Sequence, residues 1–168
     1  MTDSLLPDDL VALARRVVAA NLASGRKIAL AESCTGGLVA GALSEIPGSS
    51  AVLDRGFVTY SNEAKQELLG VSRDLIETFG AVSVAVAWSM AQGALAHSHA
   101  DVAVAITGIA GPDGGSEQKP VGTVVFACAH RGDTEEDANA EMRIFEEAKT
   151  RADVRRQAVL VALELLLP

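Results

Sequence analysis

The sequence predicts a layered α/β fold built on a mixed sheet. In the middle of the chain, short apolar segments typical of buried strands alternate with segments of helical periodicity. After residue 102, strand-like segments follow one another directly, so part of the sheet should be antiparallel. The 168 residues are 49% apolar and only 4% aromatic, which favours a core of Ala, Val, Leu and Ile. Because no repeat or linker interrupts the pattern, we expect one domain over 1–168.

In the first half of the chain, apolar residues at helical spacing predict helices, and glycine or proline marks where each should end. Short apolar, β-branched and aromatic runs predict strands. The predicted elements are, in order, helix 10–22, strand 27–31, helix 38–43, strand 55–60, helix 62–69 and helix 72–79.

The second half is predicted to contain the remaining strands. A long Ala-rich helix carries Trp88, which we expect in the core or a groove because a single aromatic makes no base-stacking surface. A capping box, Thr150 with Asp153, should start the last helix. The predicted elements are helix 83–100, strand 102–107, glycine-rich loop 108–120, strand 123–129, acidic connection 131–139, edge strand 140–145 and a helix from 151.

Composition excludes several classes of protein. Subtracting 22 acidic from 14 basic residues gives a net charge of −8, and without a basic run the chain is a poor nucleic-acid binder. The two cysteines, Cys34 and Cys128, form no disulfide framework or zinc-site spacing, so we expect no metal. The N-terminus lacks signal-peptide character, and the apolar C-terminus is too short to span a membrane. We therefore expect a cytoplasmic protein.

Residues 29–37, Ala-Leu-Ala-Glu-Ser-Cys-Thr-Gly-Gly, are the most informative segment. They place Ser33, Cys34 and Thr35 where a buried strand turns into a helix. Ligands of open α/β sheets bind beyond the carboxyl ends of strands, and free N–H groups at a helix start attract oxyanions. The segment therefore suits a nucleophile with a backbone oxyanion site. The alternative is an ordinary strand–turn–helix junction in which Ser33 or Thr35 is a cap.

Two further polar segments follow predicted strands, 60–65 and 107–115. If these strands are parallel neighbours, all three segments meet at one edge of the sheet. The 107–115 segment matches neither the dinucleotide fingerprint nor the P-loop, although its glycines permit close approach to a phosphate or ribose. The alternative for this segment is a long surface turn.

A serine nucleophile needs a base, and no histidine lies near the three segments. Lys65 is the available base, since the helix dipole and burial would both lower its pKa. A Ser–Lys pair assisted by the Tyr60 hydroxyl is the simplest assembly. Lys65 could instead be a surface lysine, and Tyr60 a strand-end aromatic. Ser61 and Cys34 are rival nucleophiles, and spacing alone does not choose among them and Ser33.

Several ordered motifs, AESCTGG, VTYSNEAK, LLGVS, GAVS and TGIAGPDGGSEQKPVGTV, resemble the C-terminal domain family of the competence/damage-inducible protein CinA. The resemblance implies a three-layer α/β/α sandwich with a mixed, mostly parallel sheet of about five strands. It implies hydrolysis of nicotinamide mononucleotide (NMN) to nicotinate mononucleotide and ammonia, without metal or cofactor. Ser33 would be the nucleophile, with Tyr60 and Lys65 handling protons.

On this basis, backbone N–H groups of 35–37 would stabilise the oxyanion. The ribose and phosphate would lie against the glycine-rich loop, Asn62 and Arg151. The residues expected to contact substrate are Thr35, Gly36, Gly37, Asn62, Thr107, Gly108, Gly111 and Arg151.

Two other functions fit the sequence. One is a non-catalytic binding or regulatory module in competence or the DNA-damage response, acting through a protein partner. The other is a Ser–Lys hydrolase of a different amide. The Ala-rich helices are also compatible with a homodimer.

Overall fold

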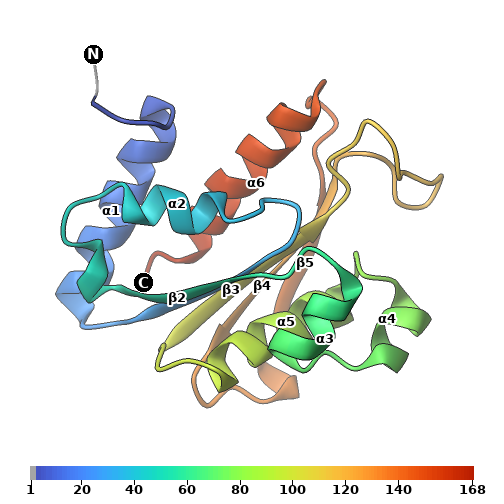
Figure 1. The fold of residues 1–168 in the computed structure, drawn as a ribbon, viewed down its shortest axis with the longest axis horizontal. Coiled ribbons are helices and arrows are strands. Elements are labelled where there is room, and N and C mark those ends of the chain that lie inside the picture. The colour runs from blue at the N-terminus through green and yellow to red at the C-terminus, as the bar shows by residue number, and fades with distance from the viewer. Residues whose placement is uncertain (1–2) are drawn as a thin grey trace.

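The computed structural model describes residues 3–168 and contains a five-stranded mixed sheet with helices on both faces (Figure 1). The strand order is β2-β1-β3-β4-β5. β2, β1 and β3 are parallel, and β4 is antiparallel to both β3 and β5, so every strand except β4 points the same way. This arrangement confirms the predicted fold class. The strands are β1 Ile28–Glu32, β2 Leu53–Val58, β3 Val102–Gly108, β4 Thr123–His130 and β5 Asn139–Ile144.

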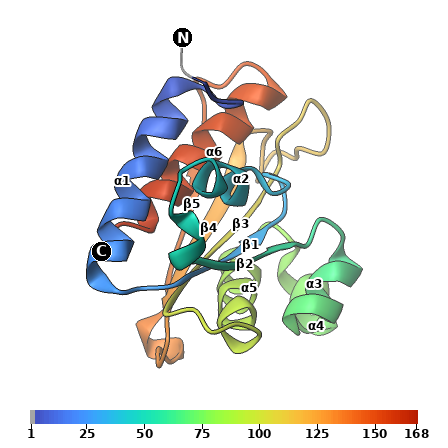
Figure 2. The same cartoon turned by 60° about the vertical axis from the view of Figure 1, so that its left-hand side comes forward.

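Two helical layers cover the sheet, as Figure 2 shows. Helices α1 and α6 pack on each other and on α2 on one face, while α3 and α4 pack on α5 on the other. The first layer consists of α1 Asp8–Ser24, α2 Leu38–Ser44 and α6 Arg151–Leu165. The second consists of α3 Asn62–Leu69, α4 Arg73–Phe79 and α5 Val84–Ala96.

The two faces of the sheet carry side chains of different size. In β1, Ile28 and Leu30 join the core beneath α1 and α6, whereas Ala29 and Ala31 join the core beneath α5. Successive strand residues point to opposite faces, so this alternation gives one bulky face and one face of small residues. The buried residues of helix α5 include three alanines and a glycine, namely Ala87, Ala91, Ala94 and Gly93. Small residues on both partners let α5 lie close against the sheet, which explains the alanine-rich composition.

Side-chain caps start several helices. The hydroxyls of Ser61, Ser72 and Ser83 accept backbone N–H groups at the starts of α3, α4 and α5. At α6, Thr150 and Asp153 form the predicted capping box. These local interactions explain why sequence patterns located these helix starts well.

Two elements end clearly before the predicted position, and the acidic connection contains a short helical turn. β2 ends at Val58 rather than at residue 60, so Tyr60 belongs to the connection. α5 ends at Ala96 rather than at residue 100, because the N–H of His99 leaves the helix and donates to the Asp54 carboxylate at 2.9 Å. The acidic connection contains a 3₁₀ turn at Glu135–Asp137. Within residues 3–168, no helix is both long and apolar enough to cross a membrane.

Helix α5 contacts α3 at Gly93, where a Cβ atom would overlap the carbonyl group of Leu69. We expect Gly93→Ala to lower the free energy of unfolding by about 1–3 kcal/mol through overpacking. Gly41→Ala in α2 is the control, because a Cβ there meets nothing within 4 Å, and it should be neutral or stabilising by up to about 1 kcal/mol. Urea denaturation of both variants measures the difference, and equal stabilities would contradict the close α3–α5 packing.

Candidate active site

The three polar segments meet at the carboxyl ends of parallel strands. Ser33 directly follows β1, Tyr60 lies just beyond β2, and Thr107 lies near the end of β3. Because β2, β1 and β3 are adjacent and parallel, these residues gather at one edge of the sheet, as predicted.

A tight turn joins Ser33 to α2. Gly36 and Gly37 have positive φ angles of 59° and 98°, a backbone region that favours glycine. The buried carboxylate of Glu32 accepts the N–H groups of Gly37 at 3.0 Å, Val39 at 3.1 Å and Ala40 at 2.9 Å. The helix cap is therefore Glu32. Neither Ser33 nor Thr35 has this role, and the Ser33 side chain is left for other chemistry.

Ser33 and Lys65 are in direct contact. The Lys65 Nζ atom lies 3.0 Å from Ser33 Oγ, 2.9 Å from the carbonyl oxygen of Thr59 and 3.3 Å from that of Tyr60. Lys65 is only 1% exposed. The surface-lysine alternative is therefore wrong, and the pairing expected from the sequence is formed.

The environment of Lys65 favours its neutral form. Burial lowers the pKa of the amine, and its recorded hydrogen-bond partners are neutral oxygens. A neutral amine has two N–H donors and one lone pair. When the carbonyls of Thr59 and Tyr60 accept the two N–H groups, the lone pair is free to accept the Ser33 hydroxyl proton. The pair can therefore act as a nucleophile and its base.

The structure favours Ser33 over Cys34 and Ser61 as the nucleophile. Burial raises the pKa of the Cys34 thiol to about 11, so little thiolate is present at neutral pH. The Ser61 hydroxyl accepts the N–H of Ala64 at 3.0 Å and serves as the cap of α3. Among the three, Ser33 is the residue whose hydroxyl contacts the buried lysine.

Tyr60 lies at the rim of the site. Its side chain is 60% exposed, and its hydroxyl accepts a hydrogen bond from the Arg151 guanidinium at 2.9 Å. Arg151 also donates to the carbonyl of Gly111 at 2.7 Å. The first turn of α6 thus links the β2–α3 connection to the glycine-rich loop. The Tyr60 hydroxyl points to Arg151, whereas Lys65 reaches Ser33 directly.

A cavity of about 200 Å³ opens over the Ser33–Lys65 pair. Part of the predicted substrate-binding set lines it, namely Asn62, Thr107, Gly108 and Arg151. Thr35, Gly36, Gly37 and Gly111 lie outside this lining. The remaining lining residues are Cys34, Tyr60, Ala81, Val82 and Ala110. Ala81, Val82 and Ala110 belong to motifs that the sequence offered, GAVS and the glycine-rich loop, but their apolar side chains resemble ordinary core and gave no reason to assign them a role.

A larger hollow, of about 570 Å³, lies elsewhere between α5 and the β4–β5 connection. Half-buried Trp88 lines it, which confirms the expected groove position of this residue. Ser89 also lines it, but no lysine, histidine or cysteine shares the lining. We therefore place the candidate chemistry in the smaller cavity.

The predicted oxyanion donors are largely occupied. The N–H of Gly36 donates to the Ser33 carbonyl at 3.0 Å, and that of Gly37 donates to Glu32. Of the three predicted donors, the N–H of Thr35 alone has no acceptor among residues 3–168. The Thr35 hydroxyl is buried and likewise has no partner in this part of the chain.

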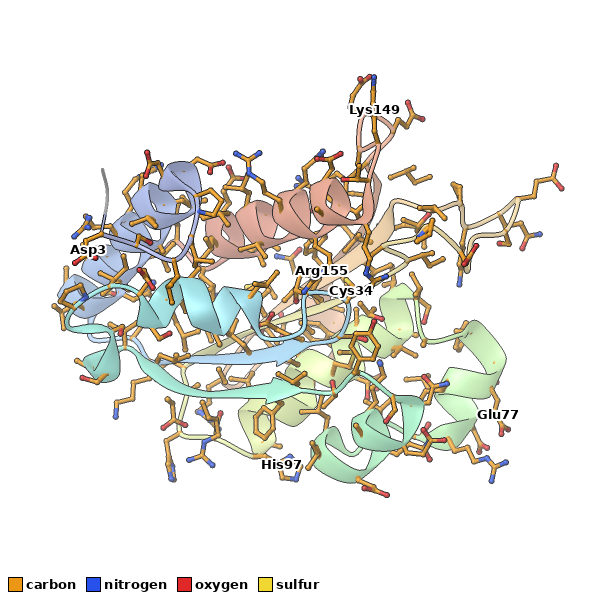
Figure 3. All side chains as sticks on the ribbon, turned by 45° about the horizontal axis from the view of Figure 1, so that its top comes forward. Asp3, Cys34, Glu77, His97, Lys149 and Arg155 are labelled. Atoms are coloured by element: carbon orange, nitrogen blue, oxygen red, sulfur yellow. The ribbon has the colours of Figure 1, made fainter. Side chains whose placement is uncertain are left out.

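Arg155 of α6 lies beside Cys34 and supports the turn (Figure 3). Its guanidinium donates to the carbonyl oxygens of Cys34 at 3.1 Å and Thr35 at 3.4 Å. This role of Arg155 was not predicted from the sequence. Its position four residues after Arg151 was an available signal, since both arginines then share one face of α6.

Comparisons with known proteins agree with this architecture. The family model of the CinA C-terminal domain matches residues 10–168. The crystal structure of competence/damage inducible protein CihA from Agrobacterium tumefaciens has a TM-score of 0.91 and 50% identity, and the match covers 97% of this chain and 96% of that one.

Two sequence relatives differ in length. The nicotinamide-nucleotide amidohydrolase PncC of Escherichia coli K12 is 50% identical over 167 residues, which cover 99% of this chain and 95% of that protein. The CinA-like protein of Mycobacterium avium is 52% identical over 159 residues, which cover 95% of this chain but 35% of that protein. The chain thus spans about a third of the length of that relative.

The buried amine predicts a specific dependence of stability on pH. Because the pKa of Lys65 is lowered from 10.5 in the folded state, the unfolded chain binds more protons between the lowered pKa and 10.5. The stability of the wild type relative to Lys65→Met should therefore rise with pH across this interval and level off above it. Urea denaturation from neutral pH to about pH 10 measures the difference. Lys149→Met, which removes an exposed lysine, controls for net charge. A difference that falls with pH would contradict a buried amine.

Proposed function

This chain belongs to the CinA C-terminal domain family, and on that basis we propose that it is an NMN deamidase. The reaction converts NMN and water to nicotinate mononucleotide and ammonia. The observation that carries the proposal is the 3.0 Å contact between Ser33 Oγ and the buried Lys65 Nζ, with a cavity open above it. A nucleophile paired with a neutral base is what hydrolysis of an unactivated amide requires.

Acylation begins when neutral Lys65 takes the Ser33 hydroxyl proton. Ser33 Oγ attacks the carboxamide carbon and forms a tetrahedral intermediate with a negative oxygen. The intermediate collapses as its C–N bond breaks, and the Lys65 ammonium returns the proton to the departing nitrogen, which leaves as ammonia. The product of this half-reaction is an ester between Ser33 and the nicotinate ring.

Deacylation repeats these steps with water. Lys65, neutral again, takes a proton from a water molecule that attacks the ester carbon. The Ser33–carbon bond then breaks, Ser33 regains a proton from Lys65, and nicotinate mononucleotide leaves. The N–H of Thr35 is the donor we assign to the oxyanion in both halves, an interaction worth about 3 kcal/mol.

The polar rim would hold the nucleotide part of the substrate. Arg151 uses part of its donor set on Tyr60 and Gly111, and its remaining N–H groups are available to a phosphate. Asn62 and Gly108 line the same cavity as this arginine and Ser33. We assign Tyr60 to orienting Arg151, with a role in proton transfer only if substrate binding frees its hydroxyl.

Ammonia release from NMN tests the proposal. We expect Ser33→Ala, with folding checked by circular dichroism, to lower kcat by about 10³-fold or more, because the acyl intermediate cannot form. Cys34→Ser and Ser61→Ala are the controls and should retain turnover. Turnover surviving in Ser33→Ala would reject Ser33 as nucleophile. A wild type inert toward NMN but active on another amide would mark a different hydrolase, and complete inactivity would favour a binding module.

Arg151→Ala tests the phosphate assignment. We expect KM for NMN to rise about tenfold or more with little change in kcat, because a charged hydrogen bond to the ground state is lost. Nicotinamide riboside, which lacks the phosphate, should be turned over equally by wild type and variant. Arg156→Ala is the matched control, since Arg156 on the same helix pairs with Asp9. An unchanged KM for NMN would exclude Arg151 as the phosphate ligand.

A further inference from the structure

Strand β5 leaves one edge of the sheet uncovered. It is the last strand in the order β2-β1-β3-β4-β5, and within residues 3–168 no segment pairs with its outer side (Figure 2). Two of its large apolar side chains are exposed, Met142 at 41% and Ile144 at 45%. A free strand edge with exposed apolar residues is a template for pairing with another strand.

The register of β5 on β4 shows which backbone groups are free. The N–H of Phe145 donates to the Gly122 carbonyl at 2.9 Å, so position 145 faces β4. In an antiparallel ladder the hydrogen-bonding direction alternates along the strand. The odd-numbered positions of β5 therefore bond to β4, and the backbone groups of Ala140, Met142 and Ile144 point outward.

We propose that this edge binds the same edge of a second copy of this chain, antiparallel and centred on Met142. A two-fold axis through that position pairs Met142 with Met142 of the other copy and Ala140 with Ile144. All three outward-facing residues then exchange hydrogen bonds with the partner strand. The result is a continuous sheet across both copies, with the exposed methionine and isoleucine covered.

Charge selects this register over its neighbours. Within one chain Arg143 donates to the Glu141 carboxylate at 2.7 Å. Centring the axis on Met142 places Glu141 of each copy opposite Arg143 of the other, as a non-hydrogen-bonded pair, so that the four charges alternate in sign. A shift of the centre to Glu141 or to Arg143 would oppose like charges. A register that pairs an even-numbered position of one copy with an odd-numbered position of the other would put apolar and charged side chains on the same face of the sheet. Of these registers, the one centred on Met142 places unlike charges opposite each other, which argues for a second copy rather than an unrelated strand.

Analytical ultracentrifugation at about 0.15 M salt tests the interface, because distant charges of the two acidic copies are then screened. We expect a reversible wild-type dimer between about 1 and 100 µM, as for small interfaces. Glu141→Arg and Arg143→Glu should each weaken association by about ten- to a hundredfold, since attractive pairs become repulsive.

Mixing the two single variants should restore the dimer, because the two arginines on the edge strand of one chain then face the two glutamates on the edge strand of the other. The double variant Glu141→Arg with Arg143→Glu should also associate like the wild type. Amide exchange at Met142 should slow as concentration rises, while Glu141, already bonded to β4, should change little. A monomeric wild type at 100 µM, single variants that associate normally, or a mixture that fails to associate would each overturn the proposal.

Discussion

The burial of one amine constrains the rest of the site. An amine is costly to bury without hydrogen-bond partners, and oxygens from two segments converge on the Nζ atom of Lys65. Thr59 and Tyr60 supply carbonyls just beyond β2, and Ser33 supplies its hydroxyl just beyond β1. The parallel pairing of β1 with β2 brings those strand ends together, and the Ser61 cap fixes the start of the helix that carries the lysine. Sheet order, helix start and amine burial therefore depend on one another.

Much of the fold was accessible from sequence because its signals are local. Glycines such as Gly25 and Gly70 end helices in the left-handed conformation, and serine or threonine caps begin them. The Ser33–Lys65 pair was also accessible, since the chain offers no histidine near the polar segments. What spacing could not decide was which of the adjacent hydroxyl and thiol groups faces the lysine, because that depends on the rotation of the turn after β1. The cap formed by Glu32 was missed for the same reason, although a charged residue ending an apolar strand was a visible signal.

The last helix completes a site that begins near the N-terminal end of the chain. Arg155 binds the carbonyls of the turn after Ser33, and Arg151 binds the rim formed by Tyr60 and Gly111. The capping box at Thr150 sets where the first turn of α6 begins, and hence where both guanidinium groups lie. Residues more than a hundred positions apart thus define one cavity, which no local sequence pattern describes.

The Glu32 cap at the start of α2 also affects which part of a ligand can approach Ser33. A helix N-terminus next to a nucleophile would ordinarily attract the most anionic part of any ligand, but here the chain's own Glu32 carboxylate already satisfies three of its N–H groups. Arg151, which lines the cavity, keeps donors free. If Arg151 binds the phosphate as proposed, a ligand with a phosphate at one end and an uncharged amide at the other would be favoured in one orientation, because the reversed pose would bring the phosphate toward the Glu32 carboxylate.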